Sequence, residues 1–279
     1  MLQAQSYSGL AATLLLLMRS PAVHADYVYN GNYVTYCGQF DAANTTSGLY
    51  DIINNAWGDD GSGLTCTTTY LGESTDTFAV FNSTWRWFDT PTEVHSYPDA
   101  LLNTALFPLV FSDLTSLKLA ANWAVVPSPS DETTTNEATL ASLDVVANVA
   151  LDVFLDEDAS TASDAATAAY EIMIWQSAYG NIQPIGKFPF NIQCLSEVNR
   201  ASTLYEGPNA NGQTVFTWYP DRNLSSISVD YLPLLETLRG AQIPSTAYVG
   251  RYQWGSETKH SAANQNITFI VNTLTMSVN

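Results

Sequence analysis

Residues 170–175, Tyr-Glu-Ile-Met-Ile-Trp, predict a β-strand, because β-branched and aromatic side chains make up most of the stretch. Side chains alternate across a strand, so Glu171, Met173 and Trp175 share one face, and the other face is apolar apart from a phenol. The apolar face should pack into a core. The face with Glu171, Met173 and Trp175 is less suited to a core, because it carries a carboxylate. A partly desolvated glutamate beside a flat aromatic ring is typical of a site that cleaves glycosidic bonds.

The rest of the chain predicts a single all-β sandwich domain. Short alternating segments rich in Thr, Val, Tyr and Trp are separated by Gly, Asn, Asp and Pro, without an internal repeat. One segment, 229–239, has leucines at helical spacing between Ser228 and Gly240, and predicts one short helix. The predicted strands are 27–36, 78–88, 117–126, 144–155, 170–176, 213–219, 248–254 and 266–278.

Residues 1–25 read as a secretory signal peptide, because an apolar run is followed by small residues that end at Ala25. The domain then covers residues 26–279. Four Asn-x-Ser/Thr sequons fit a secreted, extracellular glycoprotein, at Asn44, Asn82, Asn223 and Asn266.

The charge balance bears on partners. Twenty-seven acidic residues oppose nine basic ones, which argues against binding to nucleic acid or to an anionic membrane. A neutral polymer or a cation is an easier partner, and solubility alone is the competing explanation of the acidity. The acidic segment 156–164 offers oxygens to calcium, but it lacks the glycine and final glutamate of an EF-hand, which favours a solvated turn.

The cysteines and histidines restrict the chemistry. In an oxidising compartment Cys37 and Cys66 are the expected disulfide, which leaves Cys194 as a buried thiol. His24 leaves with the signal peptide, so only His95 and His260 remain and a three-histidine metal site is excluded. No Gly-x-Ser-x-Gly motif supports a serine nucleophile. We expect no metal and no cofactor.

Cleavage of a glycosidic bond usually takes two carboxylates, about 5–5.5 Å apart when the configuration is retained. Glu171 is the first candidate. Glu257 is the second, because it ends another aromatic strand, residues 252–257, and shares a face with Gln253. Taken alone, either glutamate could equally lie at an exposed strand edge or in a salt bridge.

Several motifs together resemble glycoside hydrolase family 12. Residues 171–175 and 179–186 resemble its nucleophile strand and the following loop, and 252–257 resembles its acid/base strand. The other similar segments are 54–58, 94–97, 147–154 and 204–209, in the order of the family and over nearly the whole mature chain.

The resemblance implies a curved, concanavalin A-like jelly-roll sandwich of two antiparallel sheets with a cleft across the concave sheet. It implies a secreted, retaining endo-β-1,4-glucanase that acts on β-glucan polysaccharides of the plant cell wall. Glu171 would be the nucleophile, Glu257 the general acid/base, and Asp152 the residue that assists the nucleophile. A third acid in the cluster should place the working range below neutral pH.

The glucan should be held by aromatic stacking and by residues that line the cleft, although core packing is the competing role for any one tryptophan. The expected substrate-binding residues are Trp57, Asn55, Met173, Trp175, Trp87 and Pro184.

The chain departs from the family pattern in two places. Phe81-Asn82 stands where Trp-His is usual, which would put the Asn82 sequon beside the cleft. Thr258-Lys259 stands where Pro-Phe is usual, and a lysine there would favour ionised Glu257.

Two alternatives to a general endoglucanase remain. The first is strict xyloglucan specificity. Residues 254–257 are a weak argument against it, because they are Trp-Gly-Ser-Glu where xyloglucan-specific members tend to have Ala-Gly-Thr-Glu. The second is a non-catalytic, lectin-like carbohydrate-binding protein. We expect a monomer.

Overall fold

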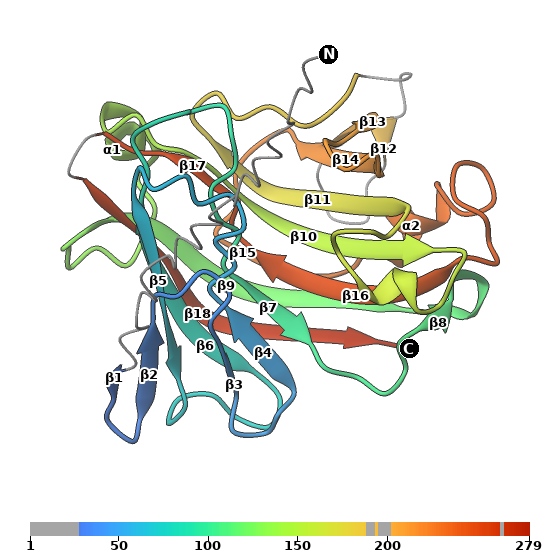
Figure 1. The fold of residues 1–279 in the computed structure, drawn as a ribbon, viewed down its shortest axis with the longest axis horizontal. Coiled ribbons are helices and arrows are strands. Elements are labelled where there is room, and N and C mark those ends of the chain that lie inside the picture. The colour runs from blue at the N-terminus through green and yellow to red at the C-terminus, as the bar shows by residue number, and fades with distance from the viewer. Residues whose placement is uncertain (1–27, 188–192, 195–201, 263–264) are drawn as a thin grey trace, which may run out of the picture.

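The computed structural model describes residues 28–187, 193–194, 202–262 and 265–279, which form two sheets packed face to face (Figure 1). The predicted signal peptide lies outside the described residues. None of the described helices is long and apolar enough to cross a bilayer.

The smaller sheet has seven strands. Its order is β1 (Val28–Tyr29), β2 (Tyr33–Tyr36), β5 (Leu64–Tyr70), β6 (Ala79–Arg86), β18 (Asn266–Val278), β9 (Leu117–Ser128) and β15 (Ser226–Asp230).

The larger sheet has eleven strands, with β10 and β11 at its centre (Figure 1). Nine of them follow the order β12 (Gln193–Cys194), β13 (Ser202–Pro208), β14 (Thr214–Pro220), β11 (Tyr170–Tyr179), β10 (Val146–Asp156), β16 (Tyr248–Gly255), β7 (Asp99–Leu102), β4 (Tyr50–Ile53) and β3 (Ala42–Asn44). Two short strands stand off this path: β17 (Thr258–His260) pairs with β10, and β8 (Leu109–Val110) pairs with β16.

The core fills the space between the two sheets. Ile172 and Ile174 of β11 belong to it, as the alternation of residues 170–175 predicts. Trp254 of the larger sheet meets Trp123 and Phe269 of the smaller one, with ring centroids 5.5 Å apart in both pairs. The opposite face of β11 carries Glu171 and is therefore turned away from this core.

The predicted all-β sandwich is confirmed, and each of the eight predicted strand segments overlaps an observed strand. One pair departs from the expected antiparallel arrangement: β11 runs parallel to β14. The Cys37–Cys66 disulfide is also confirmed, and it ties the end of β2 to β5.

The prediction of a single helix is wrong, because the described residues contain two short α-helices. Helix α2 (Leu232–Glu236) lies in the predicted segment, but β15 occupies its first residues, so Ser228 is not the N-cap. Helix α1 (Glu137–Ser142) has only six residues, too few to show a helical period. The amide oxygen of Asn136 accepts from Thr139 N (3.1 Å) and caps it.

Candidate active site

Three carboxyl groups gather on the face of the larger sheet that points away from the core. Asp152 of the central strand β10 lies directly opposite Met173 of β11 on one side and Gln253 of β16 on the other. Glu171 lies two residues before Met173, and Glu257 follows the end of β16. The structure therefore brings together the three residues for which the sequence predicts catalytic roles.

Asp152 is buried, whereas both glutamates are partly exposed. Burial raises the pKa of all three carboxyl groups. It brings the pKa of Glu171 to about 8 together with the negative charge of Glu257, and the charges of both glutamates further raise the pKa of Asp152. Neighbouring acids that disfavour each other's ionisation share protons, so the cluster carries fewer than three negative charges near neutral pH.

Asn148 of β10 holds Glu257 from two sides. Its amide oxygen accepts from the Glu257 backbone N–H (2.8 Å), and its Nδ2 donates to Glu257 Oε2. This donor and the positive charge of Lys259 lower the pKa of Glu257, but burial outweighs them and the net shift is upward. The Lys259 ammonium itself donates to Thr92 O (3.0 Å). The role of Asn148 could not be predicted from the sequence, because its partner lies more than a hundred residues away along the chain.

Glu171 has a weaker partner. Asn209 Nδ2 lies 3.4 Å from Glu171 Oε2 and donates a shorter bond to Gln213 Oε1 (2.7 Å). Oδ1 of Asp152 is buried and has no hydrogen-bond partner among the described residues. An ionised oxygen in that position would be uncompensated, which favours a proton on the Asp152 carboxyl.

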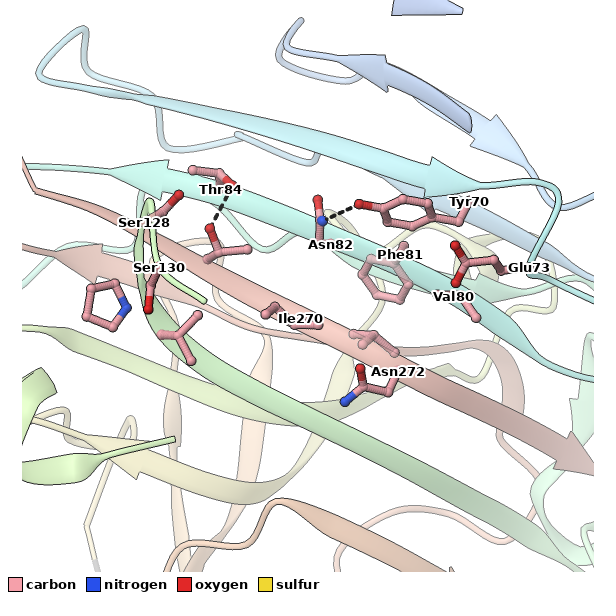
Figure 2. Close-up of a pocket in the computed structure, with 14 residues that line it drawn as sticks. Tyr70, Glu73, Val80, Phe81, Asn82, Thr84, Ser128, Ser130, Ile270 and Asn272 are labelled. Carbon is pink, nitrogen blue, oxygen red and sulfur yellow. Dashed lines mark hydrogen bonds between the residues drawn. The ribbon is translucent and has the colours of Figure 1, made fainter. Parts of the chain in front are cut away.

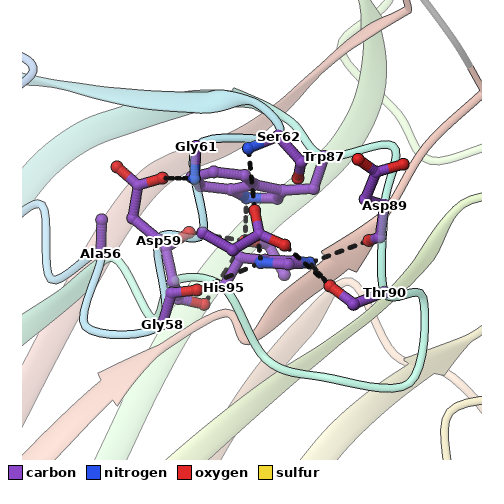
Figure 3. Close-up of polar contacts among 12 residues, drawn as sticks. Ala56, Gly58, Asp59, Gly61, Ser62, Trp87, Asp89, Thr90 and His95 are labelled. Atoms are coloured by element: carbon purple, nitrogen blue, oxygen red, sulfur yellow. Dashed lines mark hydrogen bonds and ion pairs between the residues drawn. The ribbon is translucent and has the colours of Figure 1, made fainter.

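Trp57 stands on an exposed loop beside this face and has 54% of its surface accessible. Asn55 adopts a left-handed backbone (φ 45°), and Tyr97 N donates to its carbonyl (2.9 Å). Gly58 N donates to His95 O (3.1 Å), and His95 Nδ1 lies 3.2 Å from Gly58 O (Figure 3). The loop is thus held by several bonds, while the indole stays free to meet a flat ligand.

The prediction that Trp87 binds substrate is wrong. Its side chain is fully buried, stacks on His95 with centroids 4.9 Å apart (Figure 3), and donates its indole N–H to Thr258 Oγ1 (2.9 Å). Core packing, the competing role, is what the structure shows for this residue.

Trp175 is likewise buried, together with Met173, in a small apolar cluster beside the carboxyl groups on the same face of the sheet. Only 2% of the Trp175 surface is accessible, which argues against stacking of a sugar on its ring. The Trp175 ring packs against Tyr219, with centroids 5.5 Å apart, and Tyr219 in turn meets Tyr205 at 6.0 Å. These two tyrosines are partly exposed, and the sequence analysis did not single them out. Contacts of Asn55, Met173 and Pro184 with substrate stay predictions.

Asn82 does not lie beside the three carboxyl groups, contrary to the sequence-based expectation. It belongs to β6 and points away from the core on the outer face of the smaller sheet, where it lines a groove of about 470 Å³ (Figure 2). Its Nδ2 donates to Tyr70 Oη (2.8 Å). The core between the sheets separates this groove from Glu171, so the groove has no part in the carboxyl chemistry.

Known proteins resemble this chain over most of its length. The sequence model of glycosyl hydrolase family 12 matches residues 48–279. Xyloglucan-specific endo-β-1,4-glucanase A of Emericella nidulans is 28% identical over 223 residues, which are 80% of this chain and 83% of that protein. The inactive glycoside hydrolase XLP1 of Phytophthora nicotianae is 27% identical over 223 residues, 80% of this chain and 84% of that protein.

Among solved structures, endoglucanase 3 of Trichoderma harzianum, from the same family, superposes with a TM-score of 0.74 at 25% identity. The alignment covers 90% of this chain and all of that one.

Proposed function

Since the chain belongs to glycosyl hydrolase family 12, we propose that it is a secreted endo-β-1,4-glucanase that cleaves internal bonds of plant cell-wall β-glucans with retention of configuration. The observation that carries the proposal is the pair Glu171 and Glu257, which flank Asp152 on one face of the larger sheet. A binding protein has no need of two neighbouring acids that oppose each other's ionisation.

In the proposed first step the Glu171 carboxylate attacks the anomeric carbon, and Glu257 gives its proton to the departing glycosidic oxygen. In the second step Glu257 takes a proton from water, whose oxygen displaces Glu171 from the sugar. Each glutamate thereby returns to its starting state, and the configuration is inverted twice.

Asp152 would keep Glu171 ionised for the attack. A proton held by the Asp152 carboxyl allows it to donate to Glu171, which stabilises the carboxylate form of the nucleophile. Burial keeps the Glu257 proton in place until the leaving oxygen needs it, because burial raises the pKa of Glu257.

The first test is release of reducing sugar from carboxymethylcellulose and xyloglucan. We expect Glu171→Gln to lower kcat by about 10⁴-fold and Glu257→Gln by about 10³-fold. The exposed Glu132→Gln serves as the matched control and should retain full activity. Proton NMR of the first product should show the β anomer. Equal product from wild type and Glu171→Gln would refute the enzymatic role, and an α anomer would refute retention.

Xyloglucan specificity is the second candidate, and the name of the Emericella relative supports it. The ratio of kcat/KM for xyloglucan to that for carboxymethylcellulose separates the two. A ratio above about 100 would establish the specific enzyme, since one missing polar contact discriminates by several kcal/mol. A ratio near one would establish the general glucanase.

A non-hydrolytic, carbohydrate-binding protein is the third candidate, because a relative of similar identity is described as inactive. Saturable glucan binding without any product, in wild type as in Glu171→Gln, would support it.

A further inference from the structure

Asp99, the first residue of β7, is a buried acid to which the mechanism above assigns no role. Its side chain has no accessible surface. Asn55 Nδ2 donates to its Oδ2 (2.9 Å), and Gln253 Nε2 donates to its Oδ1 (2.7 Å). Both carboxylate oxygens are therefore occupied, each by an amide from a different part of the site.

The two amides belong to the two halves of the candidate site. Asn55 lies two residues before the exposed Trp57, and its left-handed backbone turns the loop that carries this ring. Gln253 lies opposite Asp152 on β16, the strand that leads to Glu257. Arg251 Nε donates to Gln253 Oε1 (2.7 Å), which fixes the amide so that its N–H faces Asp99.

The backbone around Asp99 packs closely against the backbone of β16. Asp99 pairs with Gly255 of β16, where an added Cβ would lie 2.3 Å from Pro98 O and 2.8 Å from Asp99 Cα. Next to this contact Ser256 N donates to Pro98 O (3.3 Å), and further along Thr258 N donates to Ser96 O (2.9 Å). Residues 96–99 thus lie against the segment that contains Glu257 and, through Asn55, against the Trp57 loop.

We propose that Asp99 is a positioning residue. Its carboxylate connects the Trp57 loop to strand β16 and so fixes the distance between the Trp57 ring, on which a sugar would stack, and the acid Glu257. The proposal rests on the glucanase function above. A polysaccharide that contacts both the Trp57 ring and Glu257 is cleaved efficiently only if the distance between them is constant, because a small misplacement of bound substrate lowers the rate strongly.

Burial raises the pKa of Asp99 to about 6, although Arg251 of β16 favours the ionised form, and Asp51 of β4 adds to the rise. The hydrogen bonds from Asn55 and Gln253 also favour the carboxylate, which is the ionised form above this pH. Asp152 of β10 and the phenol of Tyr97 are the other titratable groups with which it interacts. Loss of the Asp99 charge should therefore also make Asp152 easier to ionise.

The experiment is a double-mutant cycle on a soluble cello-oligosaccharide. Asp99→Ala should raise KM about tenfold, and Trp57→Ala should do the same. In the Trp57→Ala background, Asp99→Ala should raise KM less than twofold, because the loop no longer presents a ring. Asp99→Asn keeps one acceptor for Gln253 and should recover part of the loss. Asp51→Asn is the matched control, since Asp51 bonds Asn103 and Asn44 rather than the loop.

Amide hydrogen exchange over residues 54–58 gives a second readout that does not require hydrolysis. Exchange should accelerate in Asp99→Ala and remain at the wild-type rate in Asp51→Asn. Additive KM effects in the cycle, or unchanged exchange in the loop, would overturn the proposal. Failure of the glucanase function itself would instead appear as equal product from wild type and Glu171→Gln.

Discussion

Lys259 and burial act in opposite directions on the pKa of Glu257. The Lys259 ammonium lowers the pKa of Glu257 while burial raises it, and burial prevails. The alkaline limb of activity should report this balance, because a general acid stops working once it has lost its proton.

Lys259→Met should therefore move the alkaline limb of kcat/KM upward by about 0.5 to 1 pH unit. Without the ammonium, the ionised form of Glu257 is less favoured, so the proton is kept to higher pH. A pH profile of wild type and variant on the same soluble glucan measures the shift. Lys118→Met, which removes an exposed lysine on β9, should leave the limb where it is. A downward shift in Lys259→Met would contradict the argument.

Some residues of the site could be predicted from the sequence because their signal is local. Glu171 and Glu257 each stand in an aromatic strand, and the exposed Trp57 lies in a recognisable short motif. Asn148 and Asp99 could not be found this way, because each acts through a partner on another strand. The prediction for Trp87 was wrong for a different reason. Strand alternation predicts which face of the strand carries its side chain, but the burial of the ring depends on the segment of residues 93–96, whose His95 stacks on it.

The Trp57 loop, residues 54–58, is an element whose shape depends on one glycine. A Cβ at Gly58 would lie 2.0 Å from Val94 O, a contact that no backbone can accept without moving. The segment that covers Trp87 and the loop that carries Trp57 would have to separate (Figure 3).

Gly58→Ala should lower kcat/KM on soluble glucan by about 10- to 100-fold, chiefly through KM, because the ring of Trp57 is displaced from the bound chain. Gly72→Ala is the control, since the nearest atom to its Cβ is 3.5 Å away, an ordinary contact. Unaltered KM in Gly58→Ala would mean that Trp57 is not part of the substrate site.

Strands and helices could be predicted from the sequence where their periodic pattern extends over many residues. Strands β9, β10 and β18 span eleven residues or more and alternate or stay apolar throughout, so their positions follow from sequence. The parallel pairing of β11 with β14 does not, because the described residues between them (180–187, 193–194 and 202–213) form no helix of the kind that usually connects parallel strands. Helix α1 is stabilised by its Asn136 cap and by the buried Leu140, not by a repeated pattern.

In the molecule as a whole, the main apolar core lies between the sheets, whereas the carboxyl groups of Asp152, Glu171 and Glu257, whose pKa is raised, lie on the opposite face of the larger sheet. This division has a thermodynamic consequence. Each buried acid on that face makes the folded state bind a proton that the unfolded chain would release, so stability depends on pH.

The free energy of unfolding should consequently fall as pH rises from about 4.5 to about 8. Burial raises the pKa of the coupled groups Asp152, Glu171 and Glu257, that of Glu171 from 4.5 to about 8, so the folded cluster shares protons in this window that the unfolded chain has released. The pKa of Asp99 moves in the same direction, from 3.8 to about 6. A raised folded pKa means that stability is greatest below the unfolded value and is lost as pH increases. The net charge of −18 acts in the same direction through self-repulsion.

At the acid end the sign reverses. Hydrogen bonds lower the pKa of Asp60 to about 2 and lower those of Asp158 and Asp164, so these groups contribute stability above pH 3.8 that is lost as pH falls. Calorimetry from pH 3 to pH 9 should show the highest Tm near pH 4.5, about 5 °C above the value at pH 8. Glu171→Gln should flatten the decline between pH 5 and pH 8, whereas Glu132→Gln should not. A Tm that increases steadily to pH 8 would show that the carboxyl cluster is not protonated in the folded protein.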